Sequence, residues 1–257
     1  MENSPNCQDI FILSGQSNMS GRGGVVTLDN RTRIWDQVVP EEANPPASCL
    51  ILRLSAELQW EIAKEPLHYD IDHDKVCGVG PGLVFAASFL RLLKEKGEET
   101  NTIGLVPCAI GGTSIVEWEK GGRLYEQMIN RAKSALRGGG TLKALLWYQG
   151  ESDAVTKELA EAYQTRLERF FTDVRYDLKA ENLPILQVKI TGTWPFCEEI
   201  RAAQSSIRVP GVYNTDAWGL PLNPDNIHLT RESQTKVGTA LAEKYVNDVL
   251  CVTRSRC

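Results

Sequence analysis

Four apolar runs that alternate with helical patterns are the feature of this 257-residue chain that most constrains its fold. Each run is rich in Ile, Leu and Val, which predicts a buried strand. The runs lie at residues 9–14, 103–110, 142–148 and 184–190. Amphipathic helices are predicted at residues 83–96, 125–136, 157–178 and 198–207. Because strands and helices alternate, we predict an α/β fold, a three-layer α/β/α sandwich with a mainly parallel central sheet.

The remaining segments have less distinct patterns. We predict a short strand within residues 209–214 and a last helix over residues 231–249. Residues 21–59 show little periodicity, and their three prolines prevent a long helix. A loop of this length inside a compact domain is usually functional or packed as a lid, so we expect one of these roles for it.

Length and composition indicate one domain that spans residues 1–257. Hydrophobic residues make up 42% of the chain and charged residues 24%, which excludes disordered and fibrous classes. The formal net charge is −5 and no basic stretch occurs, so nucleic acid is not an expected partner. The seven cysteines include no Cys-x-x-Cys pair, so we expect free thiols in a reducing compartment and no zinc site.

The N-terminal residues give an expectation for the location of the protein. Residues 1–8 are polar and lack the basic start and apolar core of a signal peptide. No stretch reaches the roughly 18 apolar residues of a membrane helix. We therefore expect a cytoplasmic protein without a membrane partner.

Polar residues and glycines follow three of the predicted strands. Ser17 follows the first strand, Gly111 and Gly112 follow the second, and Gln149 follows the third. Parallel strands place their C-terminal ends at one edge of the sheet, where open α/β sheets bind ligands. We therefore expect these groups to converge on one site by topology alone.

An acid and a base lie close together near the C-terminus, because Asp225 and His228 are three residues apart. The other histidines, His68 and His73, lie in the acid-rich segment 68–74, which has the composition of a solvated loop. A serine beyond a strand, with an Asp and a His elsewhere, supplies the parts of a nucleophilic hydrolase. Taken singly, the serine block is a turn, the histidine is a structural residue or a helix cap, and the aspartate forms an Asx-turn.

Four sequence blocks resemble those of the SGNH-type hydrolases. They are SGQSNM at residues 14–19, GGTS at 111–114, WYQGESD at 147–153 and DNIHL at 225–229. More closely, they resemble the branch that contains the sialate O-acetylesterase-like proteins and carbohydrate esterase family six, including its plant members. The resemblance covers about residues 10–249 and implies the flavodoxin-like SGNH hydrolase fold. Where many SGNH enzymes have Gly-x-Asn-Asp, this chain has QGES at residues 149–152.

The resemblance and the chemistry of ester hydrolysis together assign roles to these residues. Ser17 is the expected nucleophile, His228 is the expected base and later acid, and Asp225 is expected to fix the histidine tautomer and to raise its pKa. The implied oxyanion hole consists of the backbone N–H groups of Ser17 and Gly112 and the side-chain amide of Gln149. That amide replaces the Asn used elsewhere in the superfamily.

Other residues near these blocks are left outside the expected catalytic set. We interpret both Glu151 and Asp153 as structural rather than as metal ligands or acid–base groups, with Glu151 holding loops by hydrogen bonds and Asp153 lying near a helix start. Trp118 fits both the border of a pocket and a packed aromatic cluster. Arg22 follows Ser17 closely enough to shape substrate access.

The sequence therefore predicts a serine esterase that removes acetyl or another small acyl group. The resemblance implies that the substrate is an O-acetylated carbohydrate. We expect no cofactor and no metal ion. Two alternatives stay open, a non-catalytic carbohydrate-binding protein on the same fold and an acyltransferase that uses the same serine.

Overall fold

A seven-stranded sheet forms the centre of the computed structural model, which describes residues 9–29, 32–98 and 102–251. In spatial order its strands are β5 (Trp60–Ile62), β4 (Leu50–Leu54), β6 (Thr102–Pro107), β1 (Asp9–Gly15), β7 (Thr141–Tyr148), β8 (Ile185–Lys189) and β9 (Val212–Asp216). All neighbours are parallel except β4 and β5, which are antiparallel. The α/β class and the mainly parallel sheet are confirmed.

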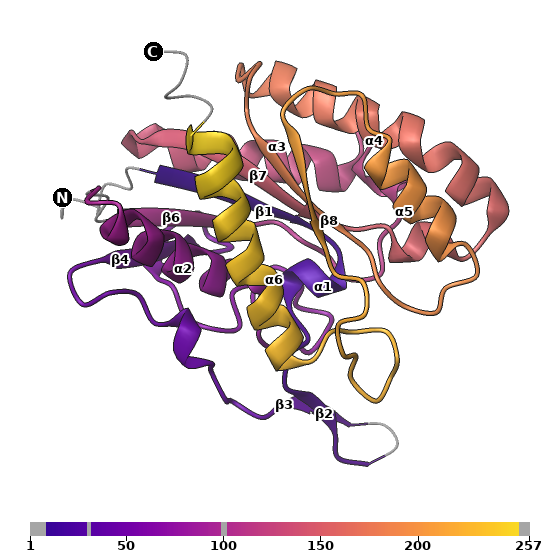
Figure 1. Cartoon of the computed structure of the whole chain (residues 1–257), viewed down its shortest axis with the longest axis horizontal. Helices are drawn as coiled ribbons and strands as arrows, with labels where there is room; N and C mark the ends of the chain where they lie inside the picture. The colour runs from indigo at the N-terminus through magenta and orange to yellow at the C-terminus, as the bar shows by residue number, and fades with distance from the viewer. Residues whose placement is uncertain (1–8, 30–31, 99–101, 252–257) are drawn as a thin grey trace.

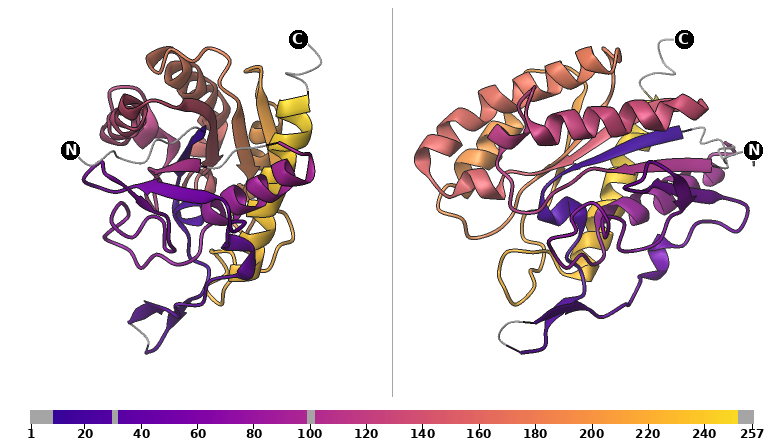
Figure 2. Two further views of the ribbon diagram at one scale, coloured as in Figure 1. Left: turned by 90° about the vertical axis from the view of Figure 1, so that its left-hand side faces the viewer. Right: turned by 180° about the vertical axis from the view of Figure 1, so that it is seen from behind.

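Helices cover both faces of this sheet, as Figures 1 and 2 show. On one face α2 (Pro81–Glu95) packs against α6 (Arg231–Lys244), which continues as a π-helical segment (Tyr245–Leu250). On the other face lie α3 (Arg123–Ala135), α4 (Lys157–Asp177) and α5 (Cys197–Ser205). The three-layer arrangement is therefore confirmed. None of the helices in the described ranges is long and apolar enough to cross a membrane.

Each face of the sheet carries aromatic side chains beneath its helices. Phe11 of β1 packs edge-on against Phe85 and Phe89 of α2, with ring centroids 5.0 and 5.5 Å apart. Trp147 of β7 packs against Phe170 of α4 on the other face, with centroids 4.5 Å apart. Burying each such side chain stabilises the fold by about 1.5–3 kcal/mol. Because both faces are sealed in this way, the ends of the strands are the places where the sheet can present polar groups.

The segment 21–59 contains three strands that the sequence analysis did not predict. β2 (Val25–Thr27) and β3 (Arg33–Trp35) form a hairpin that projects from the body of the molecule (Figure 1), and β4 joins the central sheet. β4 is hard to recognise because Arg53 interrupts its apolar run. This arginine is 1% exposed, and its Nε donates to Glu61 on β5 at 2.8 Å. Its two terminal nitrogens donate to Asp70, and the ion pairs with both carboxylates permit a charge inside the sheet.

The prediction of a solvated loop at residues 68–74 is wrong for its first histidine. His68 is only 1% exposed, and burial lowers its pKa to about 3, so the ring is neutral at physiological pH. Asp72 is also buried, whereas the side chain of His73 is 74% exposed. Composition suggested solvent because the segment is acid-rich, but one of its carboxylates is neutralised by Arg22 within the protein.

Candidate active site

Ser17 lies just beyond β1, at the first residue of the one-turn helix α1 (Ser17–Ser20). Gly15 turns the chain there with a φ of 131°, and a Cβ at this position would lie 2.1 Å from the carbonyl oxygen of Tyr148. The N–H of Gln16 donates to the same carbonyl at 2.9 Å. Only glycine permits so close an approach of two backbones. The approach fixes Ser17 at the sheet edge where its place in the sequence predicts it.

Asp225 and His228 share one turn shortly before α6. Asp225 Oδ1 accepts the backbone N–H groups of Ile227 and His228, each at 3.0 Å, and its Oδ2 lies 2.7 Å from Nδ1 of the histidine ring. Asp225 is therefore both an Asx-turn acceptor and the partner of the ring. Because an ionised carboxylate can only accept, Nδ1 is the donor, and Nε2 of the neutral ring keeps a lone pair that can take a proton.

Asn18 connects the serine segment to the histidine turn. Its Oδ1 accepts the N–H of Leu229 at 3.0 Å, and its Nδ2 donates to Glu151 Oε1 at 2.8 Å. Its backbone carbonyl accepts from Gln234 Nε2 of α6 at 3.1 Å. The residue after Ser17 thus holds the residue after His228, although the two lie 211 positions apart in the sequence.

A cavity of about 300 Å³ opens beside His228. The β2–β3 hairpin forms one wall and the turn that carries Asp225 forms another. Its lining residues are Arg22, Gly24, Val25, Val26, Thr27, Arg33, Asn223, Pro224, Asp225 and His228. Apolar walls with a few convergent polar groups are typical of small-molecule sites. The hairpin that the sequence analysis missed therefore helps to build the candidate site.

Arg22, which the sequence analysis left outside the catalytic set, is buried beside the serine. Its guanidinium donates to Asp72 Oδ2 at 2.5 Å and to Ser20 Oγ at 2.8 Å. A Cβ on Gly111 would lie 2.5 Å from Nη2 of Arg22 and 3.4 Å from Cβ of Ser17. The absence of a side chain at Gly111 therefore lets the loop after β6, the Arg22–Asp72 pair and Ser17 pack against one another.

Two backbone N–H groups, those of Gly112 and Ser17, are the predicted backbone donors of the oxyanion hole. Gly112 follows Gly111 beside the serine, has a φ of 78°, and a Cβ built on it would meet nothing within 4 Å. The N–H of Ser17 lies at the first position of a helix, where no intrahelical acceptor exists. Both residues follow the C-terminal end of a parallel strand, β1 or β6, and their role as oxyanion donors stays a prediction.

Gln149 has a different set of partners from the one that the sequence suggests. Its side chain is fully buried, and its Nε2 lies within donating distance of Asp153 Oδ2 at 2.6 Å, Thr113 O at 3.0 Å and Gln16 Oε1 at 3.2 Å. An amide nitrogen carries only two hydrogens, so protein acceptors already occupy it. Gln149 thus ties together the loops that follow β1, β6 and β7. Its role as a side-chain oxyanion donor stays a prediction.

The two ionisable groups of the turn have shifted pKa values with separate causes. Burial pushes the pKa of Asp225 upward, but the hydrogen bonds from the backbone and ring of His228 and from Ile227 outweigh it, so the pKa lies below its usual value. For His228 burial is the largest effect and lowers the pKa, while Asp225 only partly offsets it. The carboxylate does raise the pKa of the histidine, but the expected net rise is wrong because burial outweighs it. The ring is neutral, and ready to accept a proton, at physiological pH.

Glu151, Asp153 and Trp118 have internal contacts. Glu151 Oε1 accepts from Asn18, and burial raises the pKa of Glu151 to about 7. Asp153 Oδ2 accepts the N–H of Ile115 at 2.9 Å as well as the amide of Gln149, and burial raises its pKa to about 6. Trp118 is fully buried and belongs to the aromatic core rather than to the cavity wall. The structural interpretation of the two carboxyls agrees with these contacts, and Asp153 lies in the short 3-10 helix Glu151–Ala154.

No group of three or more His, Cys, Asp or Glu side chains within residues 9–29, 32–98 and 102–251 is arranged to hold a metal ion.

The sequence analysis did not single out Asn18 or Asp72. Asn18 had a signal, because it lies inside the SGQSNM block, whereas Asp72 lies in a segment with no recognisable pattern.

Comparison with known proteins gives matches over most of the chain. The family model described as "Carbohydrate esterase, sialic acid-specific acetylesterase" matches residues 7–247. The probable carbohydrate esterase At4g34215 of Arabidopsis thaliana is 48% identical over 240 residues, which are 93% of this chain and 90% of the relative. The X-ray structure of the Arabidopsis thaliana protein AT4G34215 has a TM-score of 0.88 at 47% identity and covers 94% of this chain and 99% of that one.

More distant solved structures share the fold. A carbohydrate acetylesterase from Xanthomonas citri has a TM-score of 0.61 at 20% identity, over 93% of this chain and 56% of that one. A variant of Axe2, an acetyl-xylooligosaccharide esterase from Geobacillus, has a TM-score of 0.51 at 13% identity, over 95% and 96%. The family model spans nearly the whole chain and the Arabidopsis relative is almost half identical to it. The chain therefore belongs to the family of carbohydrate esterases described as sialic acid-specific acetylesterases, and it is a carboxylic ester hydrolase.

Proposed function

We propose that this protein is a serine esterase that removes acetyl or other small acyl groups from an O-acetylated carbohydrate, with Ser17, His228 and Asp225 as its catalytic triad. One observation carries the proposal. The turn in which Asp225 holds the ring of His228 at 2.7 Å is itself hydrogen-bonded, through Leu229, to the residue that follows Ser17. A base with a fixed tautomer is thus attached to the segment that carries the candidate nucleophile.

The first half of the reaction follows from this arrangement. Nε2 of His228 takes the proton of the Ser17 hydroxyl as Oγ attacks the ester carbonyl, and the carbonyl oxygen becomes an oxyanion. The N–H groups of Ser17 and Gly112 donate to that oxyanion. Gln149 is the predicted third donor, and its amide must exchange one of its protein acceptors for the oxyanion to act in this way. The intermediate then collapses, the bond to the alcohol oxygen breaks, and His228 returns the proton to the leaving sugar hydroxyl.

The second half repeats the same chemistry with water. The acyl group is now an ester of Ser17, and His228 takes a proton from a water molecule that attacks it. Collapse of the second intermediate returns the proton to Oγ and releases the carboxylic acid. Throughout, the ionised Asp225 stabilises the imidazolium that forms at His228, and its lowered pKa keeps it ionised at neutral pH.

Size and relatives support the choice of substrate. The cavity beside His228 measures about 300 Å³, the low end for ligand sites, which suits a small acyl group and one sugar unit. Hydrogen-bonding side chains of Arg33, Thr27 and Asn223 line it, as a polyhydroxylated alcohol requires. The relative from Xanthomonas citri is described as a carbohydrate acetylesterase, which favours an acetyl group.

Hydrolysis of p-nitrophenyl acetate by the wild type and by Ser17→Ala tests the nucleophile. We expect wild-type turnover, loss of activity in Ser17→Ala, and an organophosphate adduct that mass spectrometry locates on Ser17. Labelling of a different serine with loss of activity would contradict the assignment. Acetate release from acetylated oligosaccharides, with alkyl and phenolic acetates as controls, tests the carbohydrate part. Transfer of the acyl group to an added alcohol in preference to water would instead identify an acyltransferase.

A further inference from the structure

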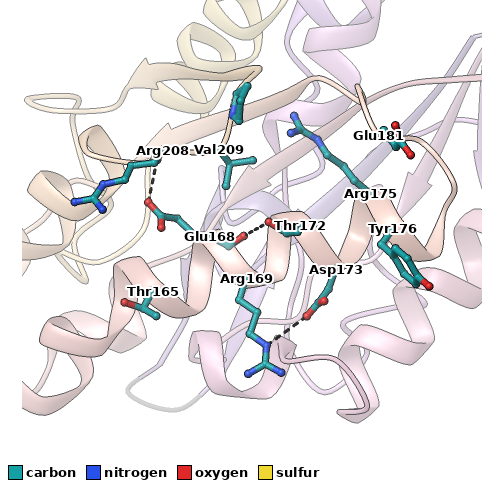
Figure 3. A pocket seen from close by; sticks show the side chains of 11 residues that line it. Thr165, Glu168, Arg169, Thr172, Asp173, Arg175, Tyr176, Glu181, Arg208 and Val209 are labelled. Carbon is teal, nitrogen blue, oxygen red and sulfur yellow. Dashed lines mark hydrogen bonds and ion pairs between the residues drawn. The ribbon is translucent and has the colours of Figure 1, made fainter.

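A second cavity lies away from the proposed catalytic residues. It is a groove of about 720 Å³ between α4 and the segment that precedes β9 (Figure 3). It is lined by Thr165, Glu168, Arg169, Thr172, Asp173, Arg175, Tyr176, Glu181, Arg208, Val209 and Pro210. Arg175 reaches the carbonyl groups of Leu183 and Gly211, which precede β8 and β9. The groove therefore lies toward the N-terminal ends of the strands, whereas Ser17 follows a C-terminal end.

One exposed face of α4 forms the floor of the groove. Its residues recur at helical spacing from Thr165 to Tyr176, as the labelled side chains of Figure 3 show. The twelve residues from Thr165 to Tyr176 extend about 17 Å along the helix axis, so the groove is elongated. Such a shape suits a chain-like ligand better than a compact one.

Arg175 presents a hydrogen-bond donor to the groove. Its side chain is 8% exposed, and its guanidinium donates to the carbonyl of Leu183 from Nε at 2.9 Å and from Nη2 at 2.7 Å. The remaining nitrogen, Nη1, makes no hydrogen bond to another described residue and is not sealed from solvent. A largely buried side chain with free N–H groups is a fixed donor for a ligand that offers oxygen acceptors.

Apolar surface lies beside these polar groups. Tyr176 is 75% exposed, and the Lys120 ammonium lies 5.0 Å from its ring centroid, so the ring is held in place while most of its surface stays free. Val209 and Pro210 form the facing wall. A flat aromatic ring with hydrogen-bonding groups beside it is complementary to a sugar ring, which has a C–H face and a polar rim.

The charges of the groove cancel. Three arginines and three carboxylates line it, and two of these groups, Arg169 and Asp173, pair at 3.7 Å. Glu168 accepts from Gln164 at 3.1 Å and from the N–H of Arg208 at 2.9 Å, which keep its pKa low. A surface without net charge has no long-range attraction for a polyanion or a polycation. Its donors and acceptors instead suit hydroxyl groups, which both donate and accept.

We propose that this groove is a second, non-catalytic binding site for a neutral oligosaccharide chain. Tyr176 stacks on a sugar ring, Arg175 donates to its oxygen atoms, and the carboxylates of α4 accept from its hydroxyl groups. The inference goes beyond the proposed esterase activity and does not depend on it, because the site requires neither Ser17 nor an ester.

Titration with oligosaccharides that carry no ester tests the groove without turnover. Unsubstituted xylohexaose, cellohexaose and mannohexaose are added separately to the wild-type protein, and backbone amide shifts and isothermal titration are recorded. We expect at least one of them to bind, with shifts confined to residues 165–176 and 208–210. Replacement of the stacking ring in Tyr176→Ala should weaken that binding at least about fivefold, with unchanged hydrolysis of p-nitrophenyl acetate.

Matched variants separate the groove from general surface effects. Tyr69 is also exposed, at 54%, and also lies against a cation, Arg53, so Tyr69→Ala should leave oligosaccharide binding unchanged. Arg175→Lys keeps the charge but removes the free guanidinium donor, and it should weaken binding too. If Arg175→Lys does not fold, Tyr176→Ala carries the test alone.

Several results would overturn the proposal. One is the absence of shifts in the groove with all three neutral hexaoses, and another is unchanged affinity in Tyr176→Ala. A third is binding of hexagalacturonate alone that disappears at about 1 M NaCl, where the Debye length is about 3 Å, because that behaviour defines an anion site. Shifts at the cavity beside His228 without shifts along α4 would place the sugar in the esterase site instead.

Discussion

Two carboxyl groups support the candidate triad, and their surroundings differ. Asp225 lies on an open turn with its side chain 26% exposed, and three N–H groups donate to it. Glu151 is 1% exposed beneath the nucleophile segment and accepts from the side chain of Asn18, while its second oxygen has no hydrogen-bond partner among the described residues. The first pKa is lowered, and burial raises the second to about 7.

The two carboxyl groups therefore differ in role: Asp225 supplies a negative charge, whereas Glu151 supplies a structural hydrogen-bond acceptor. Asp225 is kept ionised, so in the proposed mechanism it can stabilise the positive charge that forms on His228. Burial raises the pKa of Glu151. Its Oε1 can accept the hydrogen bond from Asn18 in either protonation state. The same replacement of a carboxyl by an amide should therefore have a large effect at one position and a small effect at the other.

Asp225→Asn should give the largest effect. The amide oxygen can still accept the two backbone N–H groups of the turn, but an NH₂ group facing Nδ1 of His228 favours the wrong tautomer. We expect kcat for p-nitrophenyl acetate to fall by about 10⁴, with little change in Tm. Steady-state kinetics and thermal unfolding measure the two quantities. Activity within tenfold of the wild type would mean that the charge of Asp225 is not required.

Gln149→Ala should give the next largest effect. Loss of an oxyanion donor typically lowers kcat by about 10²–10³ while KM changes little. The variant also leaves Thr113 O without this donor and takes one donor from Asp153, so the free energy of unfolding should fall by about 1–3 kcal/mol. Kinetics and urea unfolding of the same samples measure both effects. If the variant is destabilised but keeps the wild-type kcat, the oxyanion hole consists of backbone amides only. Gln149 would then have only the structural role of connecting loops.

Glu151 gives a smaller effect that depends on the replacement. Glu151→Gln retains an oxygen for Asn18 Nδ2, so kcat should change by less than about threefold, whereas Glu151→Leu removes the acceptor and should lower kcat by roughly tenfold. Comparison of kcat for these two variants with kcat for Asp225→Asn tests whether Asp225 acts through its charge and Glu151 only through its hydrogen bond. Equal losses in Glu151→Gln and Asp225→Asn would remove the distinction between the two carboxyls.

The pH dependence of the free energy of unfolding gives a second way to distinguish Glu151 from Asp225. The pKa of Glu151 is raised from 4.5 to about 7 in the folded protein, so its contribution to stability is complete below pH 4.5 and is lost as the pH rises toward 7. Glu151→Gln should abolish this part of the slope of unfolding free energy against pH. Urea unfolding at a series of pH values measures the slope, and an unchanged slope in the variant would assign it to other groups.

The acid limb of activity should give the smallest effect. His228 must be neutral to act as a base, and burial lowers its pKa, so kcat/KM should fall with a midpoint below the unperturbed value of about 6.5. A pH profile of p-nitrophenyl acetate hydrolysis locates the midpoint. A midpoint above 7 would show that the charge of Asp225 dominates over burial, contrary to the structure.

Much of the fold was predictable because the central strands bury both faces. The runs that became β1, β6, β7 and β8 are continuous and apolar, and the helices that cover them have clear periodicity. β4 and β5 were not predictable in the same way. An arginine such as Arg53 is normally solvated, and its partners Glu61 and Asp70 come beside it only in the folded chain, so local sequence does not reveal these pairings.

Some parts of the candidate site were predictable from the sequence and others were not. The positions of Ser17 and Gly112 follow from strand ends at one edge of a parallel sheet, which topology alone predicts. The Asn18–Leu229 and Arg22–Asp72 contacts join segments with no shared period, so only the folded chain reveals them. The direction of the pKa shift of His228 was also mispredicted, because spacing reveals the nearby carboxylate but not the depth of burial.

The bridge from Asn18 to the histidine turn has a consequence for the timing of activity in a newly made protein. During synthesis the segment with Ser17 leaves the ribosome first, while Leu229 and Gln234, which hold Asn18, follow 211 and 216 positions later. With the proposed triad, a nascent chain carries a hydroxyl without its base until the histidine turn has emerged. The chain would then become able to cleave esters only after that turn has packed against the segment with Ser17.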